Sequence, residues 1–422
     1  MPSSSPPSSS FLLKTLTSPK VTGFFLLGLL NNASYVIMIA GAKSISEGSV
    51  ALVFLCNVLP SFLCKLTSPL WFHRVSYKLR VNVCMILMSL SFIIVGLCSS
   101  YKIKLLGVAF ASLQSGLGEG SMLALAGLHE DPVLCLTAWS SGTGAAGIFG
   151  FAWVVAFQSL GFTLTLLFAN ALTVFFGVTF YQILPPPPTP LVVGVLSSDC
   201  LKESESIKDS EDGLSDSEVL LDNRASSFSI SPPPSPVPMK LRDRRAFTRE
   251  LSKYMVPLLV VYFAEYAMQS GTWAAIGFPV TDEEARKEFY TWANWTYQAG
   301  VFASRSSGKI YRPTLTAVQA MPALQVLLLA FFYAVAYFKI LYGYGLMLPC
   351  FMTGLLGGCV YVNAFSLISE EVEGRERKEL ALATASVADS FGIMMADVAG
   401  LFIQACLYEK HGIEGAKVQC IY

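Results

Sequence analysis

The chain has 422 residues, of which 53% are hydrophobic and 14% are charged, and its mean hydropathy is +0.55. Soluble domains carry about 25% charged residues, so this composition excludes an ordinary soluble domain and indicates a membrane protein with many spans. The 29 basic and 29 acidic residues balance, which gives no signature of nucleic-acid binding or of acidic substrates.

The chain opens with a Ser- and Pro-rich tail, residues 1–20, that we expect to be disordered and cytosolic. The apolar run after it is long enough to span a bilayer and has no convincing cleavage site, so no cleavable signal peptide is expected. A helix of about 20 apolar residues spans the hydrocarbon core. This criterion predicts a first bundle of six helices within 21–184, with spans at 21–42, 50–70, 81–99, 104–128, 134–157 and 160–184.

Residues 185–250 are predicted to form a disordered cytosolic linker, since their Pro-rich, acidic and Ser-rich composition cannot bury enough apolar surface to fold alone. Within this interval Asp216, Leu220 and Leu221 fit the acidic dileucine pattern that adaptor complexes read as a sorting signal. The pattern is short and common, so the alternative is a solvated acidic tract.

A second bundle of about five helices is predicted within 251–409, with spans at 254–278, 290–306, 314–337, 340–365 and 379–408. The span at 290–306 is short and polar, but the topology requires it. If the N-terminus is cytosolic, 21 of the 29 Lys and Arg residues fall on the cytosolic side and eight on the other. The positive-inside rule therefore favours a cytosolic linker and a C-terminal tail, residues 410–422, on the opposite, lumenal side.

No metal site or cofactor is predicted. The ten cysteines include no CxxC pair, which excludes a zinc ribbon or a disulfide scaffold, and we expect them to be small apolar packing residues. The histidines (His73, His129 and His411) are dispersed. The triplet at Asn294–Thr296 matches a glycosylation acceptor, but we expect it to lie too close to the membrane to be used.

Acids inside the spans are the first candidate functional residues. Glu265 is the one ionisable residue in 256–278. A carboxylate at that depth costs roughly 2.5–3.5 kcal/mol on insertion scales, so it faces protein or water. Either it lines a central cavity, where it exchanges a proton or binds a cationic group, or it is a structural acid paired with a neighbouring helix.

Three further acids present the same choice. Glu119 lies among Gly116, Gly118 and Gly120 on the fourth span, where the glycines allow close helix packing or bending. Its alternatives are a proton or solute site and an acid paired with a loop base. Asp389 and Asp397, on the last span, are about 12 Å apart along a helix. They line one path or are hydrogen-bonded packing acids.

Arg305 ends the eighth span, where it either binds a phosphate or carboxylate through a bidentate fork or anchors the topology. Lys65 is expected to be a snorkelling anchor rather than a solute ligand. Asn31, Asn32, Ser34 and Tyr35 form a polar patch in the first span, of which Asn32 and Tyr35 are candidates to line a cavity; the alternative is a helix contact.

Seven phrases, in order and in both bundles, carry a resemblance to a known family: GLLNNASYVIMIAGA (28–42), SLQSGLGEGSMLAL (112–125), AWSSGTGAAGIFG (138–150), PLLVVYFAEY (257–266), YQAGVFASRSS (297–307), LLGGCVYVNAF (355–365) and ATASVADSFGI (383–393). Together they resemble battenin, the Batten-disease membrane protein family. The resemblance implies a lysosomal or vacuolar protein with a major-facilitator-like fold. It also implies a link to lysosomal pH homeostasis, export of glycerophosphodiesters and cationic amino acid levels. Vertebrate members of the family end in a prenylation box, but Cys420 here is third from the end rather than fourth, so prenylation is not expected.

The expected protein is therefore an all-α polytopic membrane protein with a major-facilitator-like two-bundle fold and about 11 transmembrane helices, six and then five. The expected function is secondary transport, with possible proton coupling, of a small polar solute. Its expected partners are that solute, protons, the lipid bilayer and adaptor complexes. The alternatives are a non-transporting regulator of endolysosomal trafficking and acidification and an intramembrane enzyme.

Overall fold

The computed structural model describes residues 18–40, 50–186, 241–414, 416 and 418–420. The described residues up to 186 and from Ala246 onward form one compact unit. The predicted sorting motif (Asp216, Leu220 and Leu221) and most of the predicted linker and N-terminal tail lie outside the described residues.

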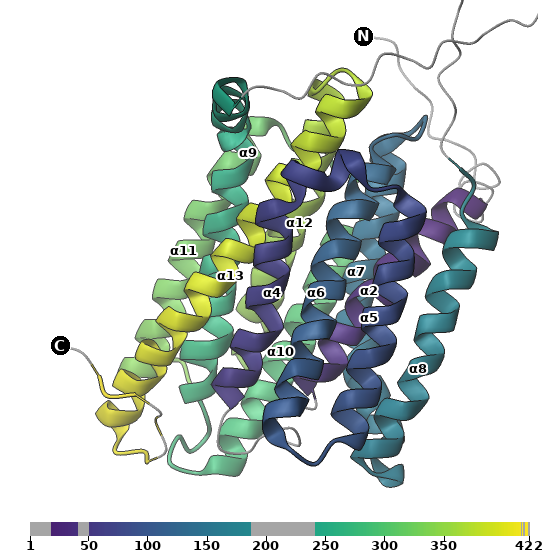
Figure 1. Ribbon diagram of the computed structural model, residues 1–422. Helices are drawn as coiled ribbons and strands as arrows, with labels where there is room; N and C mark the ends of the chain where they lie inside the picture. Colours follow the sequence, from purple (N-terminus) through teal and green to yellow (C-terminus); the bar gives the residue numbers. More distant parts are fainter. Residues whose placement is uncertain (1–17, 41–49, 187–240, 415, 417, 421–422) are drawn as a thin grey trace, which may run out of the picture. The chain divides into compact units, whose positions relative to one another are not determined.

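Six long helices of alternating direction form the first bundle in the described part of the chain (Figure 1). They are α2 Pro19–Ala40, α4 Val50–Trp71, α5 Tyr77–Leu97, α6 Tyr101–Ala126, α7 Pro132–Phe157 and α8 Phe162–Val178. Short helical turns follow α4, α7 and α8, namely η1 Phe72–Arg74, η2 Gln158–Leu160 and the π-turn η3 Thr179–Ile183. Ser76 caps α5 by accepting a hydrogen bond from the Leu79 amide, which satisfies one free donor of the first turn.

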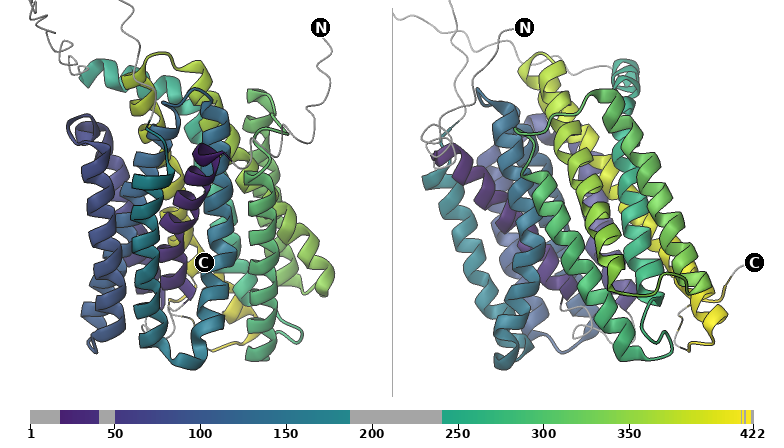
Figure 2. Two further views of the ribbon diagram at one scale, coloured as in Figure 1. Left: turned by 90° about the vertical axis from the view of Figure 1, so that its right-hand side faces the viewer. Right: turned by 180° about the vertical axis from the view of Figure 1, so that it is seen from behind.

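Five long helices form the second bundle in the described residues (Figure 2). They are α9 Leu241–Ala267, α10 Glu283–Arg305, α11 Leu315–Phe338, α12 Met347–Glu371 and α13 Arg375–His411, with the turns η4 Met268–Thr272, η5 Trp273–Ala275 and η6 Tyr344–Leu346. Helix α9 begins ten residues before the predicted start of this bundle, since the basic run there consists mainly of good helix formers. Asp282 caps α10 and Thr314 caps α11.

Because neighbouring helices run in opposite directions, their ends gather at two ends of the unit (Figures 1 and 2). We call the end at which α2, α7 and α13 begin (Pro19, Pro132 and Arg375) the linker end. The opposite end, at which α13 stops at His411, is the tail end.

Glycines bring helix backbones into direct contact inside each bundle. A Cβ atom built on Gly142 of α7 would lie 2.0 Å from the Phe25 carbonyl oxygen of α2. A Cβ on Gly354 of α12 would lie 2.1 Å from the Tyr297 carbonyl oxygen of α10. Side chains larger than hydrogen are therefore excluded at both positions, as expected for close small-residue helix interfaces.

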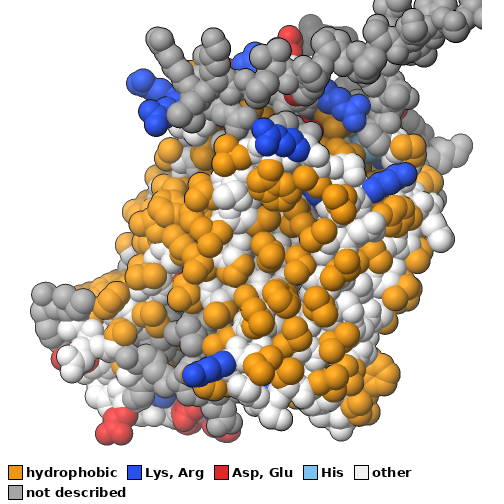
Figure 3. Space-filling model, viewed as in Figure 1, with side chains coloured by type: hydrophobic (Ala, Val, Ile, Leu, Met, Phe, Trp, Pro, Cys, Tyr) orange, Lys and Arg blue, Asp and Glu red, His pale blue; other side chains and the backbone are white. Residues whose placement is uncertain are grey.

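The outer surface of the helices is apolar, as expected for helices that lie in a lipid bilayer. By length and composition, seven helices in the described residues qualify as membrane spans. Large apolar side chains point outward from the helices, among them Leu63 and Leu66 of α4, Ile86 of α5, Phe175 of α8 and Leu327 of α11. Hydrophobic side chains cover the middle of the face in Figure 3, whereas Lys, Arg, Asp and Glu gather toward its two ends. The chain is a multi-pass membrane protein, and the predicted all-α fold with about 11 helices is confirmed.

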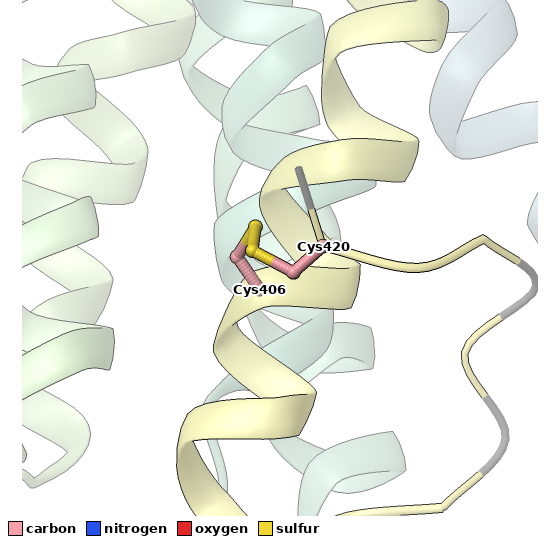
Figure 4. Close-up of a disulfide and its surroundings, with 2 residues drawn as sticks. All are labelled: Cys406 and Cys420. Atoms are coloured by element: carbon pink, nitrogen blue, oxygen red, sulfur yellow. A yellow bond between two sulfur atoms is a disulfide. The ribbon is translucent and has the colours of Figure 1, made fainter. Parts of the chain in front are cut away.

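The tail end holds a disulfide that the sequence did not predict. Cys406 of α13 is bonded to Cys420, with the two Cα atoms 4.6 Å apart (Figure 4). Gly412, with φ +65°, ends α13 in the left-handed conformation, and the Ile413 amide donates to the Tyr408 carbonyl. This turn reverses the chain and brings Cys420 back to Cys406. Because these two cysteines are bonded to each other, the expectation that all cysteines are apolar packing residues is wrong for this pair.

Candidate functional site

A cavity of about 540 Å³, its opening included, lies between the two bundles. The first bundle contributes Asn32, Tyr35, Asn57, Val58, Ser61, Lys65, Ser115 and Glu119 to its lining. The second bundle contributes Tyr262, Tyr266, Arg305, Tyr361, Asp389, Ser390 and Ile393.

Lys65 of α4 lies at the centre of this lining, and its ammonium contacts both bundles. Its Nζ is 2.6 Å from Glu119 Oε2 on α6 and 3.2 Å from Asp389 Oδ1 on α13, and it donates to Ser390 Oγ over 2.8 Å. A lysine has three donors, so these contacts use all of them. The side chain is 2% exposed. The prediction of a snorkelling anchor is therefore wrong, because the carboxylates on α6 and α13 hold the ammonium inside the protein.

Glu119 is shared between three elements. One of its oxygens takes the Lys65 ammonium, and the other accepts a hydrogen bond of 2.6 Å from the Tyr361 hydroxyl of α12. Asp389 is held in turn by its own helix, since its Oδ1 accepts from the amide and the hydroxyl of Ser390. Two carboxylates thus share one ammonium in a buried place, which leaves the cluster with one excess negative charge if all three groups are ionised.

Arg305 also lines the cavity and has no ion-pair partner among the described residues. One terminal nitrogen donates to Thr143 Oγ1 of α7 over 2.6 Å, and the other donates to the Tyr262 hydroxyl over 2.7 Å. Its guanidinium carbon is 4.3 Å from the centre of the Tyr361 ring, a cation–π distance. The Nε–H has no acceptor. An arginine fixed by neutral partners keeps its charge available to an anion.

Glu265 is buried beside the cavity rather than in its lining. Its Oε1 accepts a hydrogen bond of 3.0 Å from Tyr297 of α10, while Oε2 has no hydrogen-bond partner. Gly357 of α12 makes room for this carboxylate, because a Cβ there would lie 1.9 Å from Oε2. Glu265 therefore sits within the second bundle, behind the cavity tyrosines and in the electrostatic field of Arg305.

The polar patch of the first span divides between two faces. Asn32 and Tyr35 line the cavity, as does Tyr266 of α9. Asn31 and Ser34 instead face α6: Asn31 donates to the Ser115 carbonyl, and Ser34 donates to the Gln114 side chain over 2.6 Å. Both interpretations of the patch therefore hold, each for a different pair of residues.

Five of the seven predicted candidates line this one cavity, namely Glu119, Asp389, Arg305, Asn32 and Tyr35. Glu265 lies next to it, and Asp397 of α13 is not among the lining residues. Sequence reasoning missed Lys65 as a site residue and did not single out Tyr262 or Tyr361. A lysine inside an apolar span was the available signal, and Lys65 was assigned to the membrane edge because of its position near the end of the span.

Asn294, the first residue of the predicted glycosylation triplet, is buried within α10. The residue is 9% exposed, and its side-chain amide donates to the Tyr290 carbonyl over 2.8 Å. That the triplet is unused stays a prediction.

The linker end is closed by polar contacts between the bundles. Arg80 of α5 pairs with Glu379 of α13 at 3.0 Å, and Lys309 pairs with Asp131 at 2.5 Å. The hydroxyls of Ser141 and Ser306 are 2.7 Å apart between α7 and the end of α10. Apolar packing adds to this seal, since Gly127 lies against Leu382. These contacts hold the two bundles together at the linker end.

Two helical bundles around a central polar cavity define a membrane protein of the major facilitator fold. Solved structures share this fold: the human organic anion transporter MFSD10 (TM-score 0.60, 13% identity, 93% of this chain and 96% of that one) and the proton:xylose symporter XylE (TM-score 0.57, 9% identity, 95% and 96%). The family model described as CLN3 protein matches residues 22–409, and the chain belongs to this family.

Named relatives agree over most of their length. The chain is 32% identical to protein btn-1 of Neurospora crassa (94% of this chain, 90% of that protein). It is 33% identical to battenin of Canis lupus familiaris (90% and 89%) and 30% identical to BTN1 of Saccharomyces cerevisiae (94% and 97%). The resemblance inferred from the sequence phrases is confirmed.

Proposed function

We propose that the protein is a secondary transporter of the endolysosomal or vacuolar membrane that moves a small polar solute and contributes to lysosomal or vacuolar pH homeostasis. The observation that carries this proposal is the cavity between the bundles, lined by Lys65, Arg305, Glu119 and Asp389. Ionisable groups at membrane depth are costly and mark solute or proton pathways. In this fold such a site lies between two halves that rock around it.

The proposed orientation places the linker end in the cytosol and the tail end in the lumen. The excess of Lys and Arg in the segments of the linker end supports it. The Cys406–Cys420 disulfide supports it independently, because disulfides persist in oxidising compartments and not in the cytosol. With the linker end sealed, the cavity of this structure belongs to a lumen-facing state.

The charge of the cargo depends on whether it binds to Arg305 or to the two acids, Glu119 and Asp389. The terminal nitrogens of Arg305 donate only to the neutral hydroxyls of Thr143 and Tyr262, and its Nε–H has no acceptor, so the positive charge is not neutralised and favours an anionic group such as that of a glycerophosphodiester. A cationic amino acid is the cargo if Glu119 and Asp389 make the dominant contacts. Between these two, the unpaired charge of Arg305 favours the anionic group, since both acids are already paired with Lys65.

The linker is proposed to be cytosolic and to recruit adaptor complexes through Asp216, Leu220 and Leu221. The sequence pattern alone supports this part of the proposal. A regulator without transport activity would need neither a polar cavity nor an unpaired arginine inside the membrane, so the cavity favours transport over that alternative.

A binding measurement tests the cargo assignment. The purified protein is titrated with a glycerophosphodiester and, separately, with arginine, and ligand-induced thermal stabilisation is followed. We expect the glycerophosphodiester to stabilise the wild type and Arg305→Gln to abolish this effect. Lys309→Gln is the matched control, because Lys309 is basic and close in sequence but pairs with Asp131 at the surface. Stabilisation by arginine that persists in Arg305→Gln would instead assign the cargo to the acids.

A further inference from the structure

Lys65 contacts residues of both bundles. Its contact to Glu119 stays within the first bundle, between α4 and α6, whereas its contacts to Asp389 and Ser390 cross to α13 of the second. The contact within the bundle is the shorter, 2.6 Å against 3.2 Å. If the bundles separate along this interface, Lys65 keeps Glu119 and loses Asp389.

Separation of the bundles leaves the buried carboxylate of Asp389 without its counter-ion. Its carboxylate is 5% exposed, and in this state the Lys65 ammonium is the one cation within ion-pair distance among the described residues. The Ser390 amide and hydroxyl are neutral donors on the same helix. A buried carboxylate that loses its counter-ion takes up a proton rather than remain charged, because desolvation penalises the ionised form.

Glu119 differs from Asp389 because its counter-ion, Lys65, belongs to the same bundle. It keeps the Lys65 ammonium of its own bundle when the bundles separate, although its hydrogen bond from the Tyr361 hydroxyl crosses to α12 and breaks. The groups that face Asp389 from neighbouring helices are Lys65 and Glu119, and its charge also acts on Tyr35, Tyr262 and Tyr361. None of these except Lys65 is a cation. The two carboxylates of the cluster are therefore inequivalent.

We propose that Lys65 is a counter-ion shared between the bundles: it binds Asp389 and Glu119 together in the lumen-facing state and keeps Glu119 alone when the linker end opens, so that Asp389 carries a proton through the conformational change. This deepens the proposed transport function, on which it rests, and assigns the proton to Asp389 rather than to Glu119 or Glu265. Lys65 acts as the positioning residue that couples protonation to the bundle interface. The proton enters at an Asp389 oxygen while Lys65 stays an ammonium.

The test needs no cargo, because it follows the linker end itself. Spin labels are placed on Lys78→Cys of α5 and Glu376→Cys of α13, two exposed positions beside the Arg80–Glu379 pair, with all cysteines except Cys406 and Cys420 replaced. The distance between the labels is measured by electron paramagnetic resonance in lipid nanodiscs at pH 7.5 and pH 5. A short distance reports a closed linker end, and a long one reports an open end.

The wild type is expected to show mainly the short distance at pH 7.5 and at least a threefold larger long-distance fraction at pH 5. Asp389→Asn removes the charge that binds Lys65, so the long distance should be populated at both pH values, at least tenfold above the wild type at pH 7.5. Glu119→Gln is the matched control, and it should keep the short distance at pH 7.5 and the response to pH. The exchange of Lys65→Asp with Asp389→Lys retains one ammonium between two carboxylates and should restore the short distance.

Two results would overturn the proposal. One is an Asp389→Asn protein that stays closed and still responds to pH, and the other is equal behaviour of the two acid variants. If Asp389→Asn does not fold, as judged by size-exclusion elution, Lys65→Met breaks the same pair from the other side and carries the same expectation. Solute uptake is measured separately, so uptake without this response would contradict the Lys65 proposal alone. The response without uptake of either cargo would contradict the cargo assignment alone.

Discussion

The guanidinium of Arg80 donates to Glu379 Oε1 over 3.0 Å and joins α5 to α13 at the linker end. Arg80 is 3% exposed and lies between two rings, with its central carbon 4.4 Å from the Phe72 centroid and 4.1 Å from the Tyr77 centroid. It also donates to the Phe72 and Val75 carbonyls. The arginine is thus fixed within its own bundle, and Glu379 is the group that leaves when the bundles part.

Neutralising Glu379 should therefore favour an open linker end. In Glu379→Gln the buried Arg80 loses its counter-ion, and breaking a buried pair costs about 3–5 kcal/mol. The spin-label distance between Lys78→Cys and Glu376→Cys should lengthen at pH 7.5. Asp131→Asn is the control, since its pair with Lys309 is over 40% exposed and such surface pairs contribute about 0–1 kcal/mol. Equal effects of the two variants would show that burial does not decide the strength of the closure.

The packing of α2 on α7 should not tolerate a methyl group at Gly142. Its Cβ would meet the Phe25 carbonyl at 2.0 Å, and that atom is backbone, so a helix must move. Overpacking of this kind costs roughly 1–3 kcal/mol. Gly96→Ala is the matched control, because its Cβ would lie 3.4 Å from the Thr163 carbonyl, an ordinary contact. Melting temperatures in detergent should fall for Gly142→Ala and stay or rise for Gly96→Ala; the reverse order would contradict the close approach.

His129, in the turn between α6 and α7, should make folding stability depend on pH. Burial, helped by the Lys20 ammonium, lowers the pKa of His129 to about 4. The unfolded chain, with a histidine pKa of about 6.5, binds the proton more readily. Stability is therefore lost as the pH falls from about 6.5 to about 4, by up to roughly 1.4 kcal/mol per pH unit.

The variant that checks this is His129→Phe, which keeps an aromatic ring against Phe24, 5.2 Å away between ring centroids. Denaturation of both proteins between pH 7 and pH 4.5 should show a steeper loss of stability for the wild type. Parallel pH profiles would mean that His129 is accessible to protons in the folded state.

The Cys406–Cys420 disulfide should be present in protein isolated from the organelle membrane. Maleimide labelling of denatured protein should modify these two cysteines only after reduction. The loop spans 14 residues, and closing a loop of this size stabilises a fold by about 3 kcal/mol in the chain-entropy model. Cys406→Ala should thus lower the melting temperature, whereas replacing the free, buried Cys350 by Ala removes no cross-link. Free thiols at both positions in the organelle would contradict a lumenal tail.

The helices could be predicted from the sequence, because a membrane span is a local property of about 20 residues. Even α10, which is polar and falls short of the hydropathy expected for a span, was predicted from topology. The start of α9 was misplaced because the basic run before it continues the helix although it is too polar to lie in the bilayer. The reversal at Gly412 that brings Cys420 to Cys406 depends on geometry that spacing alone does not reveal.

The candidate site could be predicted only in part. Acids within apolar spans stand out, and Glu119, Asp389 and Arg305 do line the cavity. The partner of Asp389 could not be predicted, since Lys65 lies 324 residues away and on the other bundle. Asp397 is also an acid within an apolar span, but it does not line the cavity. It lies eight residues after Asp389 and therefore points in a different direction around α13.

The measurement that tests the central claim most directly is uptake of labelled glycerophosphodiester and of labelled arginine into proteoliposomes across an imposed pH gradient. Wild-type protein is compared with Arg305→Gln, Asp389→Asn, Glu119→Gln and Glu265→Gln. The account predicts glycerophosphodiester uptake that Arg305→Gln abolishes and whose dependence on the pH gradient is lost in Asp389→Asn. Folded wild-type protein that moves neither solute, with or without the gradient, would contradict a transporter of these solutes.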